Sequence, residues 1–218
     1  MRVVVTRAAE QAEPLARRLS ELGHEVVFCP LIRIEPLGDE QIDCSGYDWV
    51  VVTSSNGAAE LARRGHGALP RVAAIGPGTA EALAERGIEP ALVASVSTQE
   101  GLLAELPRPV GRVLLAAAEG ARRLLVEELG ADFVPLYRVV QLHPATPPEG
   151  DLVVLASPSA ARAFGALGLG IPALTIGPQT TAAAQETGVV VKAEADPHDL
   201  EGLLAAVARL RRSCSSPS

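Results

Sequence analysis

The stretch that decides the fold reads Asp48-Trp49-Val50-Val51-Val52-Thr53-Ser54-Ser55-Asn56-Gly57. Its apolar, β-branched run after an acidic residue is typical of a strand buried in a parallel sheet. The small hydroxyl and amide residues that follow are typical of the first turn of a helix. A strand that passes directly into a helix leaves free backbone N–H groups beyond the carboxyl end of the sheet, where open α/β sheets bind their ligands.

The same pattern returns about a hundred residues later, where residues 151–160 read Asp-Leu-Val-Val-Leu-Ala-Ser-Pro-Ser-Ala. Further pairs match in order: Pro30 with Pro135, Gly76-Pro77 with Gly177-Pro178, Thr79 with Thr180, Gly87 with Gly188, and residues 100–103 with residues 201–204. The distance in sequence between matching residues falls from 105 to 101 along the chain, which indicates that the two copies differ in the lengths of their loops. The repeat predicts two copies of one α/β unit, each of about five strands.

Composition agrees with an α/β class. The chain has 218 residues, a net charge of −7, 48% hydrophobic residues and only 3% aromatic residues, so its interior is built from Ala, Val, Leu and Ile. The negative charge argues against nonspecific binding to nucleic acid or to anionic membranes, while a local anion site remains compatible with it. Three cysteines lack metal-ligand spacing, and neither a signal peptide nor a membrane-spanning run appears, so we expect a cytoplasmic protein.

Four strand-to-helix turns carry the candidate chemistry. They are Thr53-Ser54-Ser55-Asn56, Gly76-Pro77-Gly78-Thr79, Ser157-Pro158-Ser159 and Gly177-Pro178-Gln179-Thr180. Each turn offers free N–H groups and a hydroxyl, which are the ingredients of an anion site. Ordinary helix capping explains any one of them, but four turns in two symmetric pairs favour a shared ligand site. If the two copies face each other, all four turns line one cleft.

Two further residues are candidates, each with an alternative. Tyr137, just before a proline-rich break at residues 143–150, is either a half-packed tyrosine or a proton donor. Arg7, at the end of the first predicted strand, is either a salt-bridge partner or a carboxylate clamp.

Several kinds of site find no support in the sequence. The turn at Gly76 lacks the third glycine of the dinucleotide fingerprint, and no Gly-Lys-Ser/Thr occurs, so no nucleotide cofactor is expected. The four histidines, His198 among them, fall at unrelated spacings, which favours surface or linker positions over a metal site. No Gly-x-Ser-x-Gly elbow indicates a nucleophilic serine.

In order and spacing over residues 1 to about 207, the chain resembles the uroporphyrinogen-III synthase family. The resemblance rests on Val5-Thr6-Arg7, residues 48–56, residues 74–80, Leu136-Tyr137-Arg138, Ser157-Pro158-Ser159, and Ile176-Gly177-Pro178 with Thr180. It implies two pseudo-symmetric, doubly wound, flavodoxin-like domains with parallel sheets, joined by a two-stranded linker. The implied domains are not sequential: domain 1 takes residues 1–35 and 143–218, domain 2 takes residues 38–138, and residues 36–37 and 139–142 link them.

The resemblance also implies a reaction. Such an enzyme, a hydro-lyase, cyclises hydroxymethylbilane, a linear tetrapyrrole rich in carboxylates, to uroporphyrinogen III with loss of water and inversion of the last pyrrole ring. Tyr137 then helps the hydroxyl leave. The implied substrate-binding residues are Arg7, Ser54, Asn56, Gly76, Thr79, Ser157, Ser159, Gly177 and Thr180. No cofactor, metal, nucleic acid or membrane is implied, and a monomer is expected. The chain departs from the commoner pattern at Ala156 and Ala117.

Two alternative functions, each from another class of protein, remain open. The first is a non-catalytic, two-domain binding protein that closes like a clamshell on a carboxylated ligand, with the same fold and the same turns. The second is a sugar-phosphate isomerase, which requires a catalytic Glu or His near the serine-rich caps. Turnover of the linear tetrapyrrole separates both from the synthase.

Overall fold

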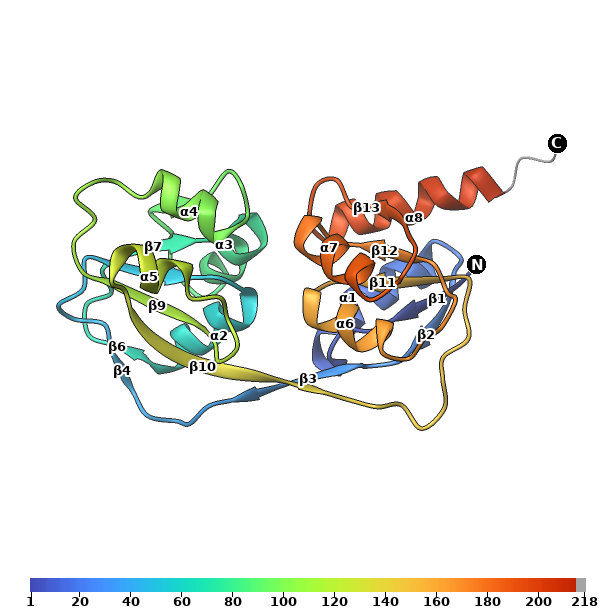
Figure 1. Cartoon of the computed structure of the whole chain (residues 1–218), viewed down its shortest axis with the longest axis horizontal. Coiled ribbons are helices and arrows are strands. Elements are labelled where there is room, and N and C mark those ends of the chain that lie inside the picture. The colour runs from blue at the N-terminus through green and yellow to red at the C-terminus, as the bar shows by residue number, and fades with distance from the viewer. Residues whose placement is uncertain (215–218) are drawn as a thin grey trace. The chain divides into compact units, whose positions relative to one another are not determined.

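In a computed structural model the chain is described over residues 1–214, with the backbone alone described at residues 9–11 and 212–214. It divides into two compact units: unit 1 is Met1–Arg33 with Val140–Ser218, and unit 2 is Ile34–Val139. The N-terminal part of the chain (blue) and the C-terminal part (orange to red) lie in the same unit (Figure 1). The chain passes between the units along β3 (Ile32–Pro36) and β10 (Asp132–Gln141).

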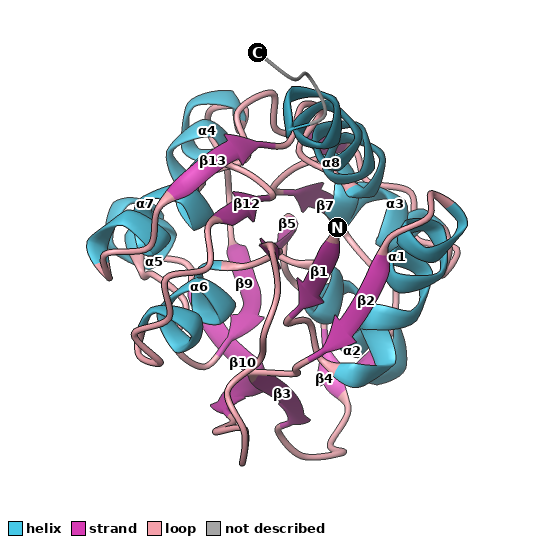
Figure 2. Ribbon diagram, turned by 90° about the vertical axis from the view of Figure 1, so that its right-hand side faces the viewer, coloured by secondary structure: helices cyan, strands magenta, loops and turns pink. Residues whose placement is uncertain are grey.

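Unit 1 is built on a five-stranded sheet with the order β13-β12-β11-β1-β2. Its strands are β1 (Arg2–Val5), β2 (Glu25–Phe28), β11 (Leu152–Leu155), β12 (Ala173–Thr175) and β13 (Val191–Glu194), and every neighbouring pair is parallel. The helices are α1 (Ala9–Glu21), α6 (Pro158–Gly165), α7 (Pro178–Glu186) and α8 (Leu200–Cys214). Helices α1 and α8 cover one side of these strands, and α6 and α7 cover the other (Figure 2).

Unit 2 contains a six-stranded sheet with the order β3-β10-β9-β5-β7-β8. It includes β5 (Trp49–Val52), β7 (Arg71–Ala74), β8 (Leu92–Val93) and β9 (Val113–Ala118); the pairs from β10 to β8 are parallel, and β3 lies at the edge. Strands β4 (Ile42–Asp43) and β6 (Gly65–His66) form a separate pair. The helices are α2 (Ser55–Arg64), α3 (Pro77–Ala84), α4 (Gln99–Glu105) and α5 (Leu124–Leu129).

Strand β5 is buried on both faces. Val50 and Val52 pack against α2 and α3, whereas Trp49 and Val51 pack against α4 and α5. This explains why the stretch that decides the fold is apolar at every position of the strand rather than at alternate ones. The predicted α/β class with parallel sheets is confirmed.

The acidic residue before each central strand has a structural role. Asp48 Oδ2 accepts a 2.7 Å hydrogen bond from the Arg112 N–H, and the Asp48 N–H donates to the Arg112 carbonyl at 2.8 Å. Asp151 makes the same two bonds with Arg2, also at 2.7 and 2.8 Å. Each carboxylate thus joins the amino end of a central strand to its neighbour.

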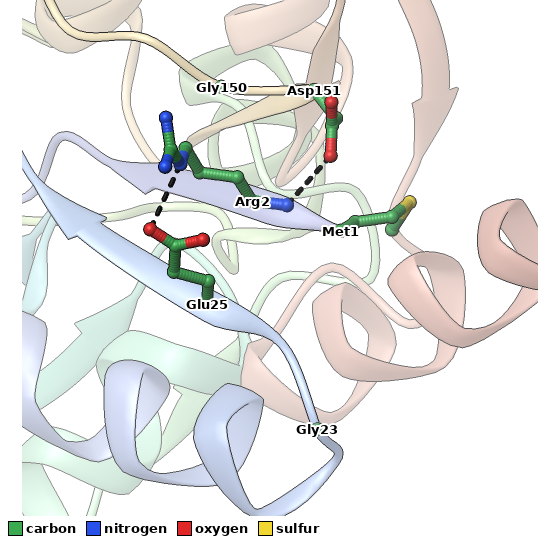
Figure 3. A pocket seen from close by; sticks show the side chains of 6 residues that line it. All are labelled: Met1, Arg2, Gly23, Glu25, Gly150 and Asp151. Carbon is green, nitrogen blue, oxygen red and sulfur yellow. Dashed lines mark hydrogen bonds and ion pairs between the residues drawn. The ribbon is translucent and has the colours of Figure 1, made fainter.

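A pocket of about 530 Å³ opens at this amino-terminal edge of unit 1 (Figure 3). Its lining includes Arg2, Glu25 and Asp151. Arg2 Nε lies 3.0 Å from Glu25 Oε1, and the Arg2 N–H donates to Asp151, so these charged groups bind one another. The candidate residues lie at the carboxyl ends of the strands, so the pocket is at the opposite edge of the sheet from them.

Candidate functional site

In each unit the candidate residues gather at the carboxyl ends of parallel strands, which share one edge of the sheet. In unit 1, Arg7 follows β1, Ser157 and Ser159 follow β11, and Gly177 and Thr180 follow β12. In unit 2, Ser54 and Asn56 follow β5, Gly76 and Thr79 follow β7, and Tyr137 pairs with Ala118 at the carboxyl end of β9. The structure therefore brings the candidates together within each unit.

The hydroxyl of Tyr137 is held by the first turn of α2. Tyr137 Oη lies 2.8 Å from Ser54 Oγ, and the side chain of Asn56 also hydrogen-bonds this hydroxyl. Ser54 is itself fixed, because it is the N-cap of α2 and its Oγ accepts a 3.0 Å bond from the Gly57 N–H. Tyr137 is only 5% exposed, whereas Ser54 and Asn56 are half-buried.

A β-bulge aims Tyr137 at this turn. The register of β10 against β9 shifts between Pro135 and Tyr137, and the consecutive side chains of Leu136 and Tyr137 both pack into the core beneath α2 and α3. Regular strand alternation would send one of them to the opposite face, and a bulge is the usual device for re-aiming a side chain.

The environment of Tyr137 keeps its proton bound at neutral pH. Burial raises the pKa of the phenol above its ordinary value, and the hydrogen bonds with Ser54 and Asn56 lower this pKa only in part. The hydroxyl is therefore a proton and hydrogen-bond donor rather than a base.

The glycine-containing turns are closely packed. A Cβ on Gly76 would lie 2.2 Å from Ser97 Oγ, and a Cβ on Gly177 would lie 3.3 Å from the ring of His198. Thr79 and Thr180 are buried, and their N–H groups donate to the carbonyls of Gly76 and Gly177 at 3.1 and 3.0 Å. These two N–H groups are therefore not free, contrary to the expectation from sequence, because the first turn of each helix closes on its own cap.

In unit 1, Ser157 caps α6 by accepting a 3.2 Å bond from the Ala160 N–H, as Ser54 caps α2. Arg7 differs from the salt-bridged arginines such as Arg18, whose guanidinium binds Glu201 at 2.9 Å. Its side chain is partly buried, burial lowers its pKa, and no carboxylate among the described residues pairs with it. A guanidinium stays charged under such burial, so this position favours an external anion.

Comparison with known proteins decides the family. A family model described as uroporphyrinogen-III synthase HemD matches residues 13–205. The chain belongs to this family. The uroporphyrinogen-III synthase of Synechococcus elongatus is 28% identical, over 96% of this chain and 95% of that protein. A putative uroporphyrinogen-III synthase of Archaeoglobus fulgidus is 34% identical, over 66% of this chain and 62% of its own length.

Solved uroporphyrinogen-III synthases have the same fold. A mutant enzyme from Thermus thermophilus superimposes with a TM-score of 0.66 at 18% identity, covering 98% of this chain and 99% of that one. The enzyme from Helicobacter pylori gives a TM-score of 0.60 at 20% identity, covering 96% and 100%. The resemblance seen in the sequence is confirmed at the level of family and parallel α/β fold.

In this family member, sequence reasoning missed the contacts of His198. The structure places its ring over Gly177, beside Glu194 at the carboxyl end of β13, with the side chain 46% exposed, which agrees with the expected surface position. A signal was available, because the repeat offset of 101 residues aligns His198 with Ser97, which covers Gly76 in the same way.

Two kinds of feature are absent from the described residues. They contain no group of three or more His, Cys, Asp or Glu side chains arranged to hold a metal ion. Within the same residues, no helix combines the length and the apolar character needed to cross a membrane.

Proposed function

We propose that this chain converts hydroxymethylbilane to uroporphyrinogen III as a cytoplasmic, monomeric enzyme without a cofactor. Membership of the uroporphyrinogen-III synthase family supports the reaction. The observation that carries the assignment of its chemistry is the buried, protonated hydroxyl of Tyr137, held 2.8 Å from Ser54 at the carboxyl edge of unit 2.

We assign the departure of the substrate hydroxyl to the Tyr137–Ser54 pair. Ser54 is the more exposed member, so its hydroxyl contacts the leaving group, donates its proton to it and accepts the proton of Tyr137. Water leaves, and the substrate becomes a resonance-stabilised azafulvene cation beside a tyrosinate. The terminal ring attacks through its substituted carbon, and the spiro intermediate breaks and recombines with that ring inverted. The tyrosinate takes back the proton that the newly bonded pyrrole releases.

We assign the substrate carboxylates to the carboxyl edges of the two units. Arg7 supplies a guanidinium that has no carboxylate partner among the described residues, and the turns supply the remaining contacts through Ser54, Asn56, Gly76, Thr79, Ser157, Ser159, Gly177 and Thr180. The linear substrate also closes by itself to the uninverted isomer, so the protein must control its conformation. Orientation effects of this kind reach about 7–11 kcal/mol in favourable cases, which is why no nucleophile is required.

We infer that the two units are pseudo-symmetric copies of a doubly wound, flavodoxin-like domain, joined by β3 and β10 as a two-stranded linker. We number the strands of unit 1 from 1 to 5 as β1, β2, β11, β12 and β13, and those of unit 2, without the edge strand β3, as β9, β10, β5, β7 and β8. Both sheets then have the spatial order 2-1-3-4-5. The matching pairs Asp48–Arg112 and Asp151–Arg2 support the correspondence. The boundaries between the two compact units, after Arg33 and after Val139, support a domain 1 that is made of two separate segments of the chain.

The test is to supply the purified protein with hydroxymethylbilane, oxidise the product, and separate the type III and type I uroporphyrin isomers by chromatography. Predominant type III, against type I in a protein-free control, is the expected result. Type I alone from folded protein would contradict the proposal and favour the clamshell binder.

A further inference from the structure

His198 occupies a defined position at the carboxyl edge of unit 1. It lies in the segment between β13 and α8, and its ring packs over Gly177, the N-cap of α7. Its side chain is 46% exposed, so the imidazole is accessible while its base is packed. His198 is not needed to cap α8, because Asp199 Oδ1 accepts the Gly202 N–H at 2.8 Å.

A chain of hydrogen bonds fixes the orientation of this imidazole. His198 Nε2 lies 3.3 Å from Glu194 Oε1, and the other oxygen of Glu194 accepts from Thr181 Oγ1. Thr181 is in turn 2.6 Å from Oγ1 of Thr175, which is fully buried. A carboxylate with its own fixed partners is the usual means of holding a histidine in one orientation and leaving the second ring nitrogen for a ligand. Among the described residues, none hydrogen-bonds Nδ1.

We propose that His198 is a substrate-binding residue whose Nδ1–H binds one carboxylate of the tetrapyrrole. The inference rests on the proposed function and deepens it. With Glu194 at Nε2 and a substrate carboxylate at Nδ1, each ring nitrogen faces an acceptor, so the imidazole binds both carboxylates through its N–H groups. Glu194 is the one carboxylate among the described residues that pairs with Nε2, so a substrate carboxylate at Nδ1 does not compete with it.

The position of His198 complements that of Arg7. Arg7 follows β1, and His198 lies at the ends of β12 and β13. In the sheet, β12 is two strands and β13 three strands away from β1. At about 4.8 Å per strand, this separation is roughly 10–14 Å. Two basic groups so far apart bind different carboxylates of one large substrate, and thereby define its orientation along the edge of the sheet.

The test compares His198→Ala, His198→Gln and His198→Arg, with His66→Gln as the matched control. His66 also stands beside a carboxylate, 4.0 Å from Asp43, but in β6 of unit 2. We expect KM for hydroxymethylbilane to rise about tenfold in the Ala and Gln variants with little change in kcat, and the control to match the parent. Arginine donates but cannot accept a hydrogen bond, so His198→Arg should restore KM if the partner is a carboxylate.

A second readout needs no turnover. Addition of uroporphyrin III, the stable oxidised product, should shift the Cε1–H resonance of His198 in proton NMR, assigned by its disappearance in His198→Gln. The shift should be reduced in Glu194→Gln, where the imidazole loses its orientation. An unchanged KM in His198→Ala together with an unmoved resonance overturns the inference while the type III product still supports the proposed function. A parent protein that yields type I alone overturns the proposed function instead.

Discussion

The hydroxyls of Ser54 and Tyr137, 83 residues apart in the chain, lie 2.8 Å apart at the start of α2. Ser54 serves two purposes there, because the same oxygen that faces Tyr137 accepts the Gly57 N–H at 3.0 Å and caps the helix. The helix terminus and the tyrosine are therefore coupled through one side-chain oxygen.

Replacing Ser54 by alanine should raise the pKa of Tyr137. Burial already raises this pKa, and the serine hydroxyl is one of two groups that oppose the shift. The measurement is an ultraviolet titration of tyrosinate in a Tyr47→Phe background, where Tyr137 is the one tyrosine left, since the chain has two. We expect the titration to move to higher pH and kcat to fall by about tenfold or more.

The control for this prediction is Thr98→Ala. Thr98 caps α4 in the same unit by accepting the Gly101 N–H at 3.0 Å, so both changes cost about 1 kcal/mol of capping. Only the loss of Ser54 should move the tyrosine titration. Equal titration curves for the two variants would show that the 2.8 Å contact has no influence on the phenol.

Replacing Tyr137 by phenylalanine should slow ring closure without changing the product isomer. The variant removes the proton donor that we propose, and such groups contribute about 10²–10⁴-fold to rates. The residues that we propose to bind the substrate carboxylates, and thereby to direct ring inversion, stay in place. The measurements are kcat and the ratio of type III to type I product. Full activity would remove Tyr137 from the mechanism.

Local features of the fold were predictable from the sequence. The apolar run from Trp49 to Val52 forms the predicted central strand, because a strand buried on both faces needs apolar residues at every position. Ser54 and Ser157 cap the helices that follow, since an N-cap depends on a residue and the N–H three positions later. These interactions lie within a few residues, and their patterns are visible in the chain.

The site itself depends on contacts between distant segments. The bulge that turns Tyr137 toward Ser54 depends on the register of β10 against β9, which no local pattern determines. His198 reaches Gly177 only because the chain folds back from β13 over the start of α7. The lack of a carboxylate partner for Arg7 among the described residues is likewise a property of its surroundings in space.

Replacing Gly111 by alanine should destabilise the protein by about 3 kcal/mol. Gly111 has a φ of +74°, which disfavours any residue with a Cβ, and a Cβ there would lie 2.1 Å from Asp48 Oδ2. The carboxylate would have to leave the Arg112 N–H. The measurement is the free energy of unfolding in urea. Gly120→Ala is the matched control, because a Cβ at Gly120 meets no atom within 4 Å, and its loss of stability should be smaller.

Replacing Arg7 by methionine should leave the free energy of unfolding unchanged or increase it, while KM rises about tenfold or more. A partly buried guanidinium with no carboxylate partner among the described side chains costs desolvation energy that methionine avoids, yet it gives the substrate carboxylate that we propose a strong partner. Arg18→Met is the comparison, because it breaks two hydrogen bonds to Glu201 at the surface. A large loss of stability in Arg7→Met, with an unchanged KM, would assign Arg7 to the structure rather than to the substrate.

Stability toward acid should depend on Glu100 and Arg122. Arg122 binds Glu100 through two hydrogen bonds, of 2.6 and 2.9 Å, and holds the pKa of this carboxyl at about 2 instead of 4.5. A lowered folded-state pKa contributes stability above about pH 4.5, and this contribution is lost as the pH falls toward 2. Because both side chains are more than half exposed, the contribution is at most about 1 kcal/mol.

The measurement is urea unfolding at pH 6 and pH 3. The parent should lose more stability between these values than Glu100→Gln, and Arg122→Gln should show the same reduced loss; parallel losses in all three proteins would exclude the pair as a source of acid sensitivity.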